Sequence, residues 1–392
     1  MRDTSQHCKS GELDEKSQPS ERPIRVAHVL GIVAKGGIES IVFNYYKLMD
    51  KSKVQFDFIV HDDSPFEIPD DILKLGCNVY KVPSYKHLPS HLRALKKVFK
   101  QGGYKIVHSH MSTISVLTLF AAKRAGIPIR IAHGHGATGK SKGEFFRNIL
   151  KYILRLFSKL YPTHLFACSA YSGKWLFGKN AYKKGKITVI NNAINTSLFV
   201  YNEEIRSKVR TRLGLSGRFV VGHVGRFLPQ KNHSFLIDIF NEIYKKDNSS
   251  ILLLVGDGAL RAHIEDKVKD MNLCDNVLFL GGRDDANEFY QAMDVFVMPS
   301  LYEGLPVVLV EAQMAALFSV ASNKINDESK FSDYIDFMDL NMSAEAWADR
   351  ALEKRGAERF DMSGQLCAEK FDIDKEALKL ENIYIRLISG EA

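Results

Sequence analysis

The chain has 392 residues, 45% of them hydrophobic and 26% charged, which is the composition of an ordinary globular protein. Its 54 Lys and Arg exceed its 46 Asp and Glu, and the formal net charge of +8 suits nucleic acid, anionic lipid or an acidic small molecule as a partner. No apolar run approaches the roughly 20 residues of a membrane-spanning helix, so an integral membrane protein is not expected.

The first segment, residues 1–22, is polar and lacks the apolar core of a secretory signal, and we expect a disordered extension here. The five cysteines are scattered along the chain and form no CxxC pair. This distribution predicts reduced thiols in a cytosolic protein rather than a disulfide framework or a zinc site.

Beyond this segment, short apolar strands alternate with longer segments of helical period. In the first half we expect strands at 24–30, 55–60, 78–82, 105–109, 128–132 and 164–168, and helices at 38–50, 88–101, 113–125 and 144–160. In the second half we expect strands at 219–224, 251–255, 277–280, 294–298 and 318–322, and helices at 233–246, 259–271, 286–293 and 306–316. Such alternation predicts an α/β fold of parallel strands with helices on both faces.

The polar stretch 192–204 has no sustained periodicity and separates the two halves. A chain of this length is also longer than a single core usually supports. We therefore expect two doubly wound, Rossmann-like domains in tandem. Ligands of such sheets bind beyond the carboxyl ends of the strands, which places the expected site in a cleft between the domains.

Two carboxylates follow the strand at 294–298. Glu303 lies in the loop 299–306 (PSLYEGLP), and Glu311 lies in the helix that follows. Pro306 fits the first position of that helix, where its missing N–H costs nothing, and Glu311 is then roughly 7–8 Å further along the axis. This spacing suits hydroxyl groups at opposite ends of a nucleotide-sugar, and solvated helix charges are the equally weighted alternative.

Two cations follow the strand at 219–224. Arg226 and Lys231 lie five residues apart in a strand-to-helix loop and can converge on one anion, together with the N–H groups of the next helix. Two exposed cations without a ligand are the alternative. Gly256 belongs to a Gly-Asp-Gly turn that lets the backbone approach a ligand closely, although such a turn alone indicates little.

Histidines gather at two strand ends of the first half: His108 with His110, and His133 with His135. The His-x-His spacing suggests a metal site, but no cysteine or carboxylate cluster accompanies it, and we expect no bound metal. Satisfied structural histidines are the alternative to a functional role.

Taken together, these motifs resemble the nucleotide-sugar domain of family 4 glycosyltransferases, which have the GT-B fold. The resemblance extends over about residues 24–390, and its specific part is 222–316. It implies that Glu303, with Gly304 and Leu305 beside it, surrounds the transferred sugar. It also implies that the ribose binds Glu311 and that the leaving diphosphate is neutralised by Arg226 and Lys231, with the turn at Gly256 nearby.

In the first half, the resemblance implies that the backbone of Gly36 and Gly37 meets the donor phosphate. It also implies that His135, with His133 close behind it, faces the transferred sugar. The chain departs from the family pattern where Ala316 replaces a usual Gly after the Glu311 helix.

The resemblance further implies how the chain divides. Residues 23–197 with a returning C-terminal helix at 372–392 would form an acceptor-side domain, and residues 198–371 a nucleotide-sugar-binding domain. Asp372 and Asp374 form a DxD string that opens the returning helix, and we interpret it as a helix cap rather than a metal site.

The implied function is transfer of a hexose from a UDP-sugar to a lipid-linked or growing polysaccharide acceptor, with retention of configuration and without cofactor or divalent metal. A nucleotide-sugar epimerase of the same fold and a catalytically degenerate relative remain alternatives. A nucleic-acid-binding protein is disfavoured because the chain has no recognisable recognition module.

The segment 144–160 predicts a basic amphipathic helix. Its apolar residues lie mostly on one face and its basic residues recur every fourth position: Phe145, Phe146, Ile149, Ile153, Leu156, Phe157 and Leu160 against Arg147, Lys151, Arg155 and Lys159. Such a helix can lie on anionic lipid, which would make the protein a peripheral enzyme on the cytoplasmic face of the cell membrane. An ordinary surface helix with a core-facing stripe is the equal alternative.

Overall fold

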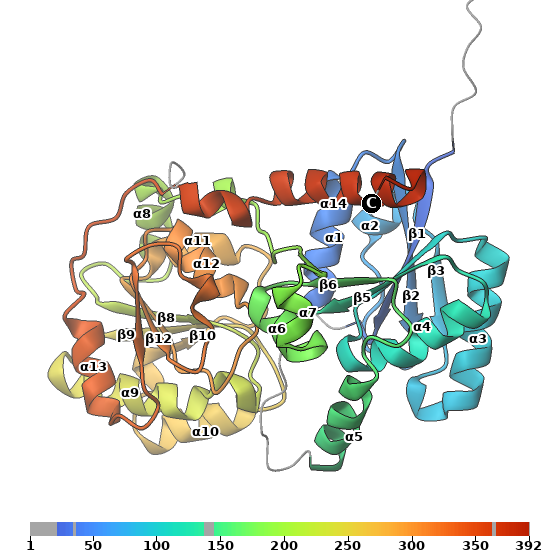
Figure 1. Cartoon of the computed structure of the whole chain (residues 1–392). Coiled ribbons are helices and arrows are strands. Elements are labelled where there is room, and N and C mark those ends of the chain that lie inside the picture. Colours follow the sequence, from blue (N-terminus) through green and yellow to red (C-terminus); the bar gives the residue numbers. More distant parts are fainter. Residues whose placement is uncertain (1–21, 34–36, 137–144, 363–365, 392) are drawn as a thin grey trace, which may run out of the picture.

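The computed structural model describes residues 22–33, 37–136, 145–362 and 366–391, and it places them in two α/β domains (Figure 1). The strands of the first domain form one sheet in the order β3-β2-β1-β4-β5-β6-β7, and every neighbouring pair is parallel. They are β1 (Ile24–Gly31), β2 (Val54–His61), β3 (Val79–Val82), β4 (Ile106–Ser109), β5 (Ile129–Gly134), β6 (His164–Ala167) and β7 (Ile187–Val189).

The second domain contains a parallel sheet in the order β10-β9-β8-β11-β12-β13. Its strands are β8 (Val220–Val224), β9 (Ile251–Val255), β10 (Val277–Phe279), β11 (Val295–Met298), β12 (Ser319–Ser322) and β13 (Ile335–Met338). In both sheets the strand order reverses beside the first strand, and this switch point is where doubly wound folds bind their ligands.

The helices cover both faces of each sheet. Those of the first domain are α1 (Ile38–Leu48), α2 (Asp70–Leu73), α3 (Leu88–Gly102), α4 (Ser115–Arg124), α5 (Phe145–Leu156), α6 (Ala170–Phe177) and α7 (Lys179–Lys183). Those that follow are α8 (Glu203–Arg212), α9 (His233–Lys246), α10 (Arg261–Asp270), α11 (Ala286–Ala292), α12 (Val307–Met314), α13 (Ala344–Leu352) and α14 (Ile373–Ser389).

The central strands are apolar on both sides because each face packs against helices. Val26 of β1 lies between Phe56 of β2 and Ile106 of β4, and all three are fully buried in one core. The next residue, Ala27, points to the opposite face and belongs to a second core. This two-sided burial explains why the strands are near-continuous apolar runs in the sequence.

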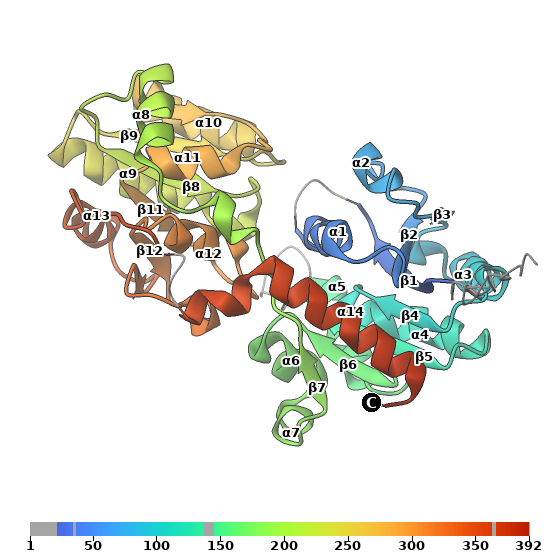
Figure 2. The ribbon, with the colours of Figure 1, turned by 90° about the horizontal axis from the view of Figure 1, so that it is seen from above.

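The last helix, α14, returns from the second domain to the first and packs against α1 (Figures 1 and 2). At its start the Asp372 carboxylate accepts hydrogen bonds from the backbone N–H groups of Asp374 and Lys375, so the DxD string is a helix cap, as expected. Further along, Glu376 and Glu381 accept hydrogen bonds from first-domain backbone at 3.0 and 2.8 Å.

The chain crosses between the domains at two places that lie side by side. Ile194 pairs with Asp372 in an isolated parallel bridge. Its N–H donates to the Phe371 carbonyl at 2.9 Å, and its own carbonyl accepts from the Ile373 N–H at 3.0 Å. The two crossing segments are therefore joined by backbone hydrogen bonds where the domains meet.

All eleven expected strands are present within two residues of their expected bounds, whereas several shorter elements were not expected. β7 and β13 have only three and four residues, and the stretch expected to be aperiodic gives way to α8 at Glu203. The placement of Pro306 at the first helical position was wrong by one residue, because Pro306 is the N-cap and α12 begins at Val307.

The end of α12 shows how the chain manages without the usual glycine. The N–H groups of Ala316 and Leu317 donate to the carbonyls of Gln313 and Ala312, which is the pattern of a Schellman motif. Ala316 itself takes the left-handed conformation with a φ of 47°. The helix therefore ends in the same motif that a glycine would form, but the backbone of Ala316 is strained in this left-handed conformation.

Candidate active site

A cavity of about 820 Å³ lies between the domains, at the carboxyl ends of the central strands. Its volume falls within the range that suits a ligand of nucleotide-sugar size. Both domains line it. The residues singled out from the sequence that line it are Gly37, His110, His135 and Lys151 in the first domain and Arg226, Lys231, Glu303, Gly304, Leu305, Pro306 and Glu311 in the second. Gly36 lies outside the described residues.

The side chains of Arg226 and Lys231 differ in their exposure and in their ion pairing. Arg226 is exposed to the cavity and makes no ion pair within the described part of the chain. The Lys231 ammonium lies 2.8 Å from the Glu303 carboxylate, and both side chains are largely buried. Arg226 is thus available to an incoming anion, whereas Lys231 would share its charge between that anion and Glu303.

Glu303 is held by a second residue that sequence reasoning missed. The Gln230 side-chain amide donates to the Glu303 carboxylate at 2.9 Å and to the Tyr302 carbonyl at 3.0 Å. Gln230 stands directly before Lys231 in the short 3₁₀ turn Pro229–Lys231. The turn therefore supplies both the amide and the ammonium that hold Glu303 in place. In the sequence, the position of a polar residue directly before the expected cation was the feature that could have indicated Gln230.

Glu311 lies in the middle of α12, against the aromatic side chain of Tyr290 from α11. The Tyr290 hydroxyl donates a hydrogen bond to the Glu311 carboxylate at 2.7 Å. Burial raises the pKa of Glu311 from its ordinary 4.5 to about 7, although the Tyr290 hydrogen bond and the Lys231 charge favour the ionised form. Near neutral pH this carboxyl group can thus be present in either protonation state.

The first domain contributes the start of α1. Gly37 is the N-cap residue, with a φ of 101° that favours glycine, and as a glycine it has no side chain with which to cap the helix. The first residues of α1 line the cavity across from Arg226 and Lys231. Unpaired N–H groups at a helix N-terminus favour an anion, so this end of α1 and the cations face a common space.

The domains approach each other closely at Gly304. A Cβ atom at this position would lie 2.8 Å from the His135 carbonyl oxygen and 2.9 Å from Gly136 Cα. Only glycine permits this approach, which brings the Glu303 loop against the end of β5. The Asn192 side chain adds an interdomain hydrogen bond to the Leu305 carbonyl at 3.3 Å.

Gly256 does not line the cavity. A Cβ there would lie 2.1 Å from the Gly225 carbonyl oxygen, and the residue has a φ of 139°. The expected close approach exists, but it joins Gly256 to the loop that carries Arg226 rather than to the cavity. In this structure the residue supports the position of that loop.

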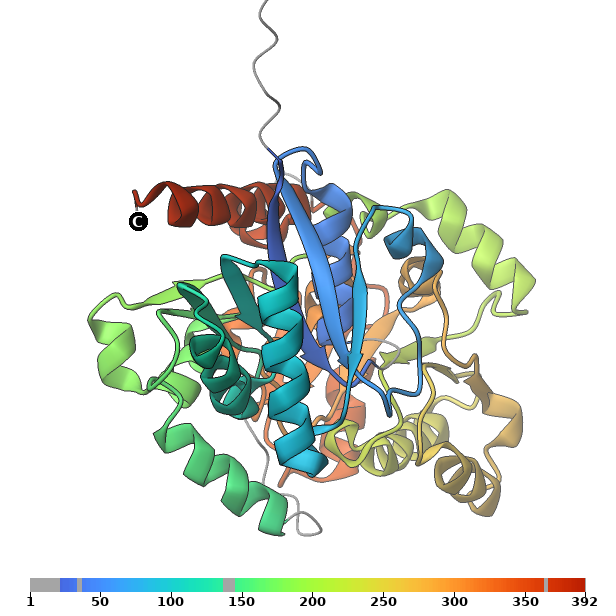
Figure 3. The same ribbon diagram turned by 90° about the vertical axis from the view of Figure 1, so that its right-hand side faces the viewer.

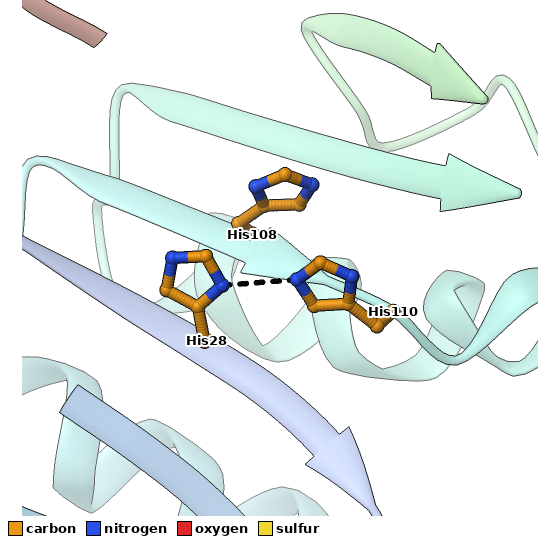
Figure 4. A group of neighbouring side chains, drawn as sticks. All are labelled: His28, His108 and His110. Atoms are coloured by element: carbon orange, nitrogen blue, oxygen red, sulfur yellow. Dashed lines mark hydrogen bonds between the residues drawn. The ribbon is translucent and has the colours of Figure 1, made fainter. Parts of the chain in front are cut away.

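His135 lines the cavity, whereas His133 is buried in the wall behind it with 4% of its surface exposed. Both belong to a larger group with His28, His108 and His110. Figure 4 shows three of them: His28 from β1 beside His108 and His110, which follow from β4 and its end. Burial lowers the pKa of all five, to about 3 for His28 and His135, so the imidazoles are neutral at physiological pH.

α5 lies at the edge of the first domain and projects away from it (Figures 1 and 3). Its apolar residues, and those just after it, are uncovered: Ile149, Leu150, Ile153, Leu156, Phe157 and Leu160 are between 41% and 78% exposed. The apolar stripe therefore does not face a core, which removes the ordinary alternative for these positions. No helix within the described residues combines the length and apolarity needed to cross a bilayer.

Comparison with known proteins identifies the family. A family model described as "Glycosyltransferase Family 4" matches residues 35–198, and one described as "Glycosyl transferases group 1" matches residues 218–350. The putative glycosyltransferase EpsF of Bacillus subtilis is 33% identical over 92% of this chain and 96% of its own length. The chain belongs to the family 4 glycosyltransferases.

Other relatives of this glycosyltransferase extend over its whole length. The UDP-Gal:alpha-D-GlcNAc-diphosphoundecaprenol alpha-1,3-galactosyltransferase of Escherichia coli is 27% identical over 93% of this chain and 97% of its own. Anabaena Alr3699/HepE, solved in complex with UDP and glucose, matches with a TM-score of 0.74 at 18% identity over 92% of this chain and 99% of that one. The structural likeness confirms the GT-B fold.

Proposed function

We propose that this glycosyltransferase transfers a hexose from a UDP-sugar to a lipid-linked or growing polysaccharide acceptor, with retention of anomeric configuration. The observation that carries the proposal is that Arg226, Lys231, Glu303 and Glu311 line one cavity opposite the start of α1. The functions of relatives support the substrate classes, since they include a UDP-galactose-dependent enzyme acting on a diphosphoundecaprenol-linked sugar and a capsular polysaccharide enzyme.

The charged side chains divide the donor between them. The diphosphate would lie between Arg226 and the N–H groups at the start of α1, and Lys231 would turn toward it as negative charge develops on the leaving group. Fixed cations in a partly buried site stabilise such charge strongly. This arrangement supplies the stabilisation from protein groups, and the proposal requires no divalent ion for departure of the diphosphate.

The sugar would lie between Glu303 and His135, and the ribose beside Glu311. His135, which is neutral, would form a hydrogen bond with a sugar hydroxyl without placing a positive charge beside the sugar. The Glu303 carboxylate forms an ion pair with Lys231 and accepts a hydrogen bond from Gln230. These contacts suit a residue that binds a hydroxyl group better than one that acts as a nucleophile. We therefore propose front-face attack by the acceptor, without a covalent enzyme intermediate.

A panel of radiolabelled UDP- and GDP-sugars, incubated with the purified chain with and without membrane extract, tests this function. Label transferred into a lipid fraction from a UDP-hexose is the expected result. Epimerised donor would indicate the epimerase alternative, and nucleotide binding without turnover would indicate a degenerate relative.

Two variants assign the roles. Glu311→Ala should weaken UDP binding, whereas His135→Ala should leave UDP binding in place and mainly lower turnover. Exposed His263 provides a matched control, because His263→Ala removes a histidine distant from the cavity lining. Full activity in both site variants would contradict the assignments.

We further propose that α5 holds the enzyme against an anionic membrane surface. The exposed apolar face would enter the interface, and the basic residues of the helix would meet lipid phosphates. A peripheral position on the cytoplasmic face would bring the cavity close to a lipid-linked acceptor.

Co-sedimentation with vesicles tests the membrane proposal. Charge reversal of Arg147, Lys151 and Arg155 should release the protein from phosphatidylglycerol-containing vesicles, and Leu156→Ser should weaken binding as well. Leu378→Ser on α14 is the matched control, since Leu378 is 57% exposed on another helix. Unchanged binding in the α5 variants would remove the proposal.

A further inference from the structure

The group of five histidines extends inward from the cavity wall and is larger than the proposed transfer reaction uses. His110 and His135 line the large cavity, and the four histidines other than His135 are no more than 4% exposed. A second, much smaller cavity of about 20 Å³ is lined by all five histidines. That volume is enough for one water molecule or one metal ion.

Three of these residues have the spacing of a metal site. One ring nitrogen each from His110, His133 and His135 lie within 4.8 Å of one another. Tetrahedral coordination by imidazole, with Zn–N bonds of about 2.0–2.1 Å, places ligand nitrogens about 3.3 Å apart, so small movements of the rings would close the site. His133 Nε2 and His135 Nδ1 have no hydrogen-bond partner among the described residues.

Hydrogen bonds behind two of the three rings, those of His133 and His110, fix their orientation. His133 Nδ1 lies 3.0 Å from His108 Nε2, and His108 Nδ1 lies 2.6 Å from the Tyr384 hydroxyl. If each Nδ1–H donates outward along this chain, the Nε2 lone pair of His133 is left pointing inward. Metal-binding histidines commonly donate their second N–H to such an outer partner.

The His110 side of the group has the same arrangement. His110 Nε2 lies 2.9 Å from His28 Nδ1, and His28 Nε2 lies 3.5 Å from the same Tyr384 hydroxyl. Donation outward along this chain leaves His110 Nδ1 as an acceptor, 2.8 Å from His135 Nε2. Both chains of donors thus end on one tyrosine of α14, and both leave an inner lone pair.

We propose that His110, His133 and His135 form a binding site for a divalent transition ion of the Zn²⁺ class. The histidines are neutral, as ligands must be, and imidazole nitrogen suits this class of ion rather than Mg²⁺ or Ca²⁺. Three protein ligands leave a fourth position open, and this position faces the large cavity through His135, which is also the route of entry for the ion. The site is separate from the phosphate-binding groups, and its existence does not depend on the proposed transferase activity.

Titration of the tag-free full chain with Co²⁺ tests the proposal, because tetrahedral Co²⁺ shows strong visible absorption. One Co²⁺ per chain, displaced by Zn²⁺, is the expected result. His133→Ala and the less disruptive His135→Gln should each abolish the tetrahedral spectrum, and the control His263→Ala should keep it. Thermal unfolding with and without Zn²⁺ shows whether each variant is folded and whether the ion stabilises it.

Tyr384→Phe gives a second, independent measurement. It keeps the ring that packs in the core but removes the oxygen on which both chains of hydrogen bonds end, and it should weaken Co²⁺ binding about 10–100-fold. A folded wild-type chain that gives no tetrahedral spectrum, or a spectrum that survives in His133→Ala and His135→Gln, would overturn the proposal.

Discussion

The first-domain wall of the cavity presents neutral histidines and a helix N-terminus, whereas the second-domain wall presents the charged side chains of Arg226, Lys231, Glu303 and Glu311. Burial keeps the imidazoles of the first wall uncharged, and hydrogen bonds among them replace those lost from water. In the second wall, Lys231 and Glu303 remain close enough to compensate each other, and Tyr290 satisfies Glu311. The comparison teaches that the same fold supplies one wall of neutral histidines, which Glu39 and Lys151 also line, and one wall whose charges can be redistributed by a ligand.

Removal of Lys231 tests the charged wall most severely. Lys231→Ala should lower kcat about 10²–10³-fold, because the developing charge on the diphosphate loses one fixed cation. Transfer kinetics with saturating donor measure this effect. Lys245→Ala is the control, since its ammonium pairs with Glu242 at 2.7 Å on the surface of α9 and should leave kcat unchanged. An equal loss in the control would show a general effect of charge.

The contact between the two walls is tested at Gly304. Gly304→Ala places a methyl group against the His135 carbonyl and should push the walls apart, lowering kcat/KM by about 10²-fold through misplacement of the reacting groups. Gly282→Ala is the control, because a Cβ there meets no atom within 4 Å. Wild-type kcat/KM in Gly304→Ala would show that this approach of the domains is not needed for activity.

Glu311 gives the second-domain wall a dependence on pH near neutrality that the histidines of the first-domain wall lack. Its pKa is raised to about 7, so the folded chain retains a proton that the unfolded chain loses above about 4.5. The contribution of this group to stability should therefore fall as the pH rises from about 4.5 to 7. Thermal unfolding across this range should show a steeper decline for the wild type than for Glu311→Gln.

The same group should affect ligand binding in the opposite direction. An ionised carboxylate is the better acceptor for ribose hydroxyls, so UDP affinity should rise as the pH passes through 7. Tyr290→Phe removes a hydrogen bond that lowers the pKa of Glu311 and should move this rise to higher pH. Calorimetric titration with UDP measures both profiles, and identical profiles for wild type and Glu311→Gln would rule out Glu311 as the titrating group.

A smaller effect is expected where a second-domain carboxylate caps a first-domain helix. Glu328 accepts hydrogen bonds from the backbone N–H groups of Ala170 and Tyr171 at 2.7 and 2.6 Å, at the start of α6. Glu328→Ala should cost about 1.5–3 kcal/mol of this interdomain contact. Scanning calorimetry should show a lower unfolding temperature for Glu328→Ala. The control Asp333→Ala, on the exposed surface of the same domain, should leave the unfolding temperature unchanged.

The sequence by itself determined the α/β class, the two sheets and the position of the motifs at strand ends, because buried parallel strands leave continuous apolar runs that are readable without neighbours. It also placed Arg226, Lys231, Glu303 and Glu311 in loops and helices that meet at one sheet edge. The short edge strand β7 was not expected, because Thr188 interrupts its apolar run.

Only the tertiary structure decided how distant residues pair. The side chain of Gln230 binds the Tyr302 carbonyl and the Glu303 carboxylate, which are 72 and 73 residues away along the chain. Tyr290 of α11 binds Glu311 of α12, and Gly304 approaches His135 of the other domain. The histidine group likewise adds His28 of β1 and Tyr384 of α14 to the four histidines that the sequence indicated, and no local spacing encodes these two partners. Composition and period report what each segment buries, whereas hydrogen bonds and charges depend on which segments the fold brings together.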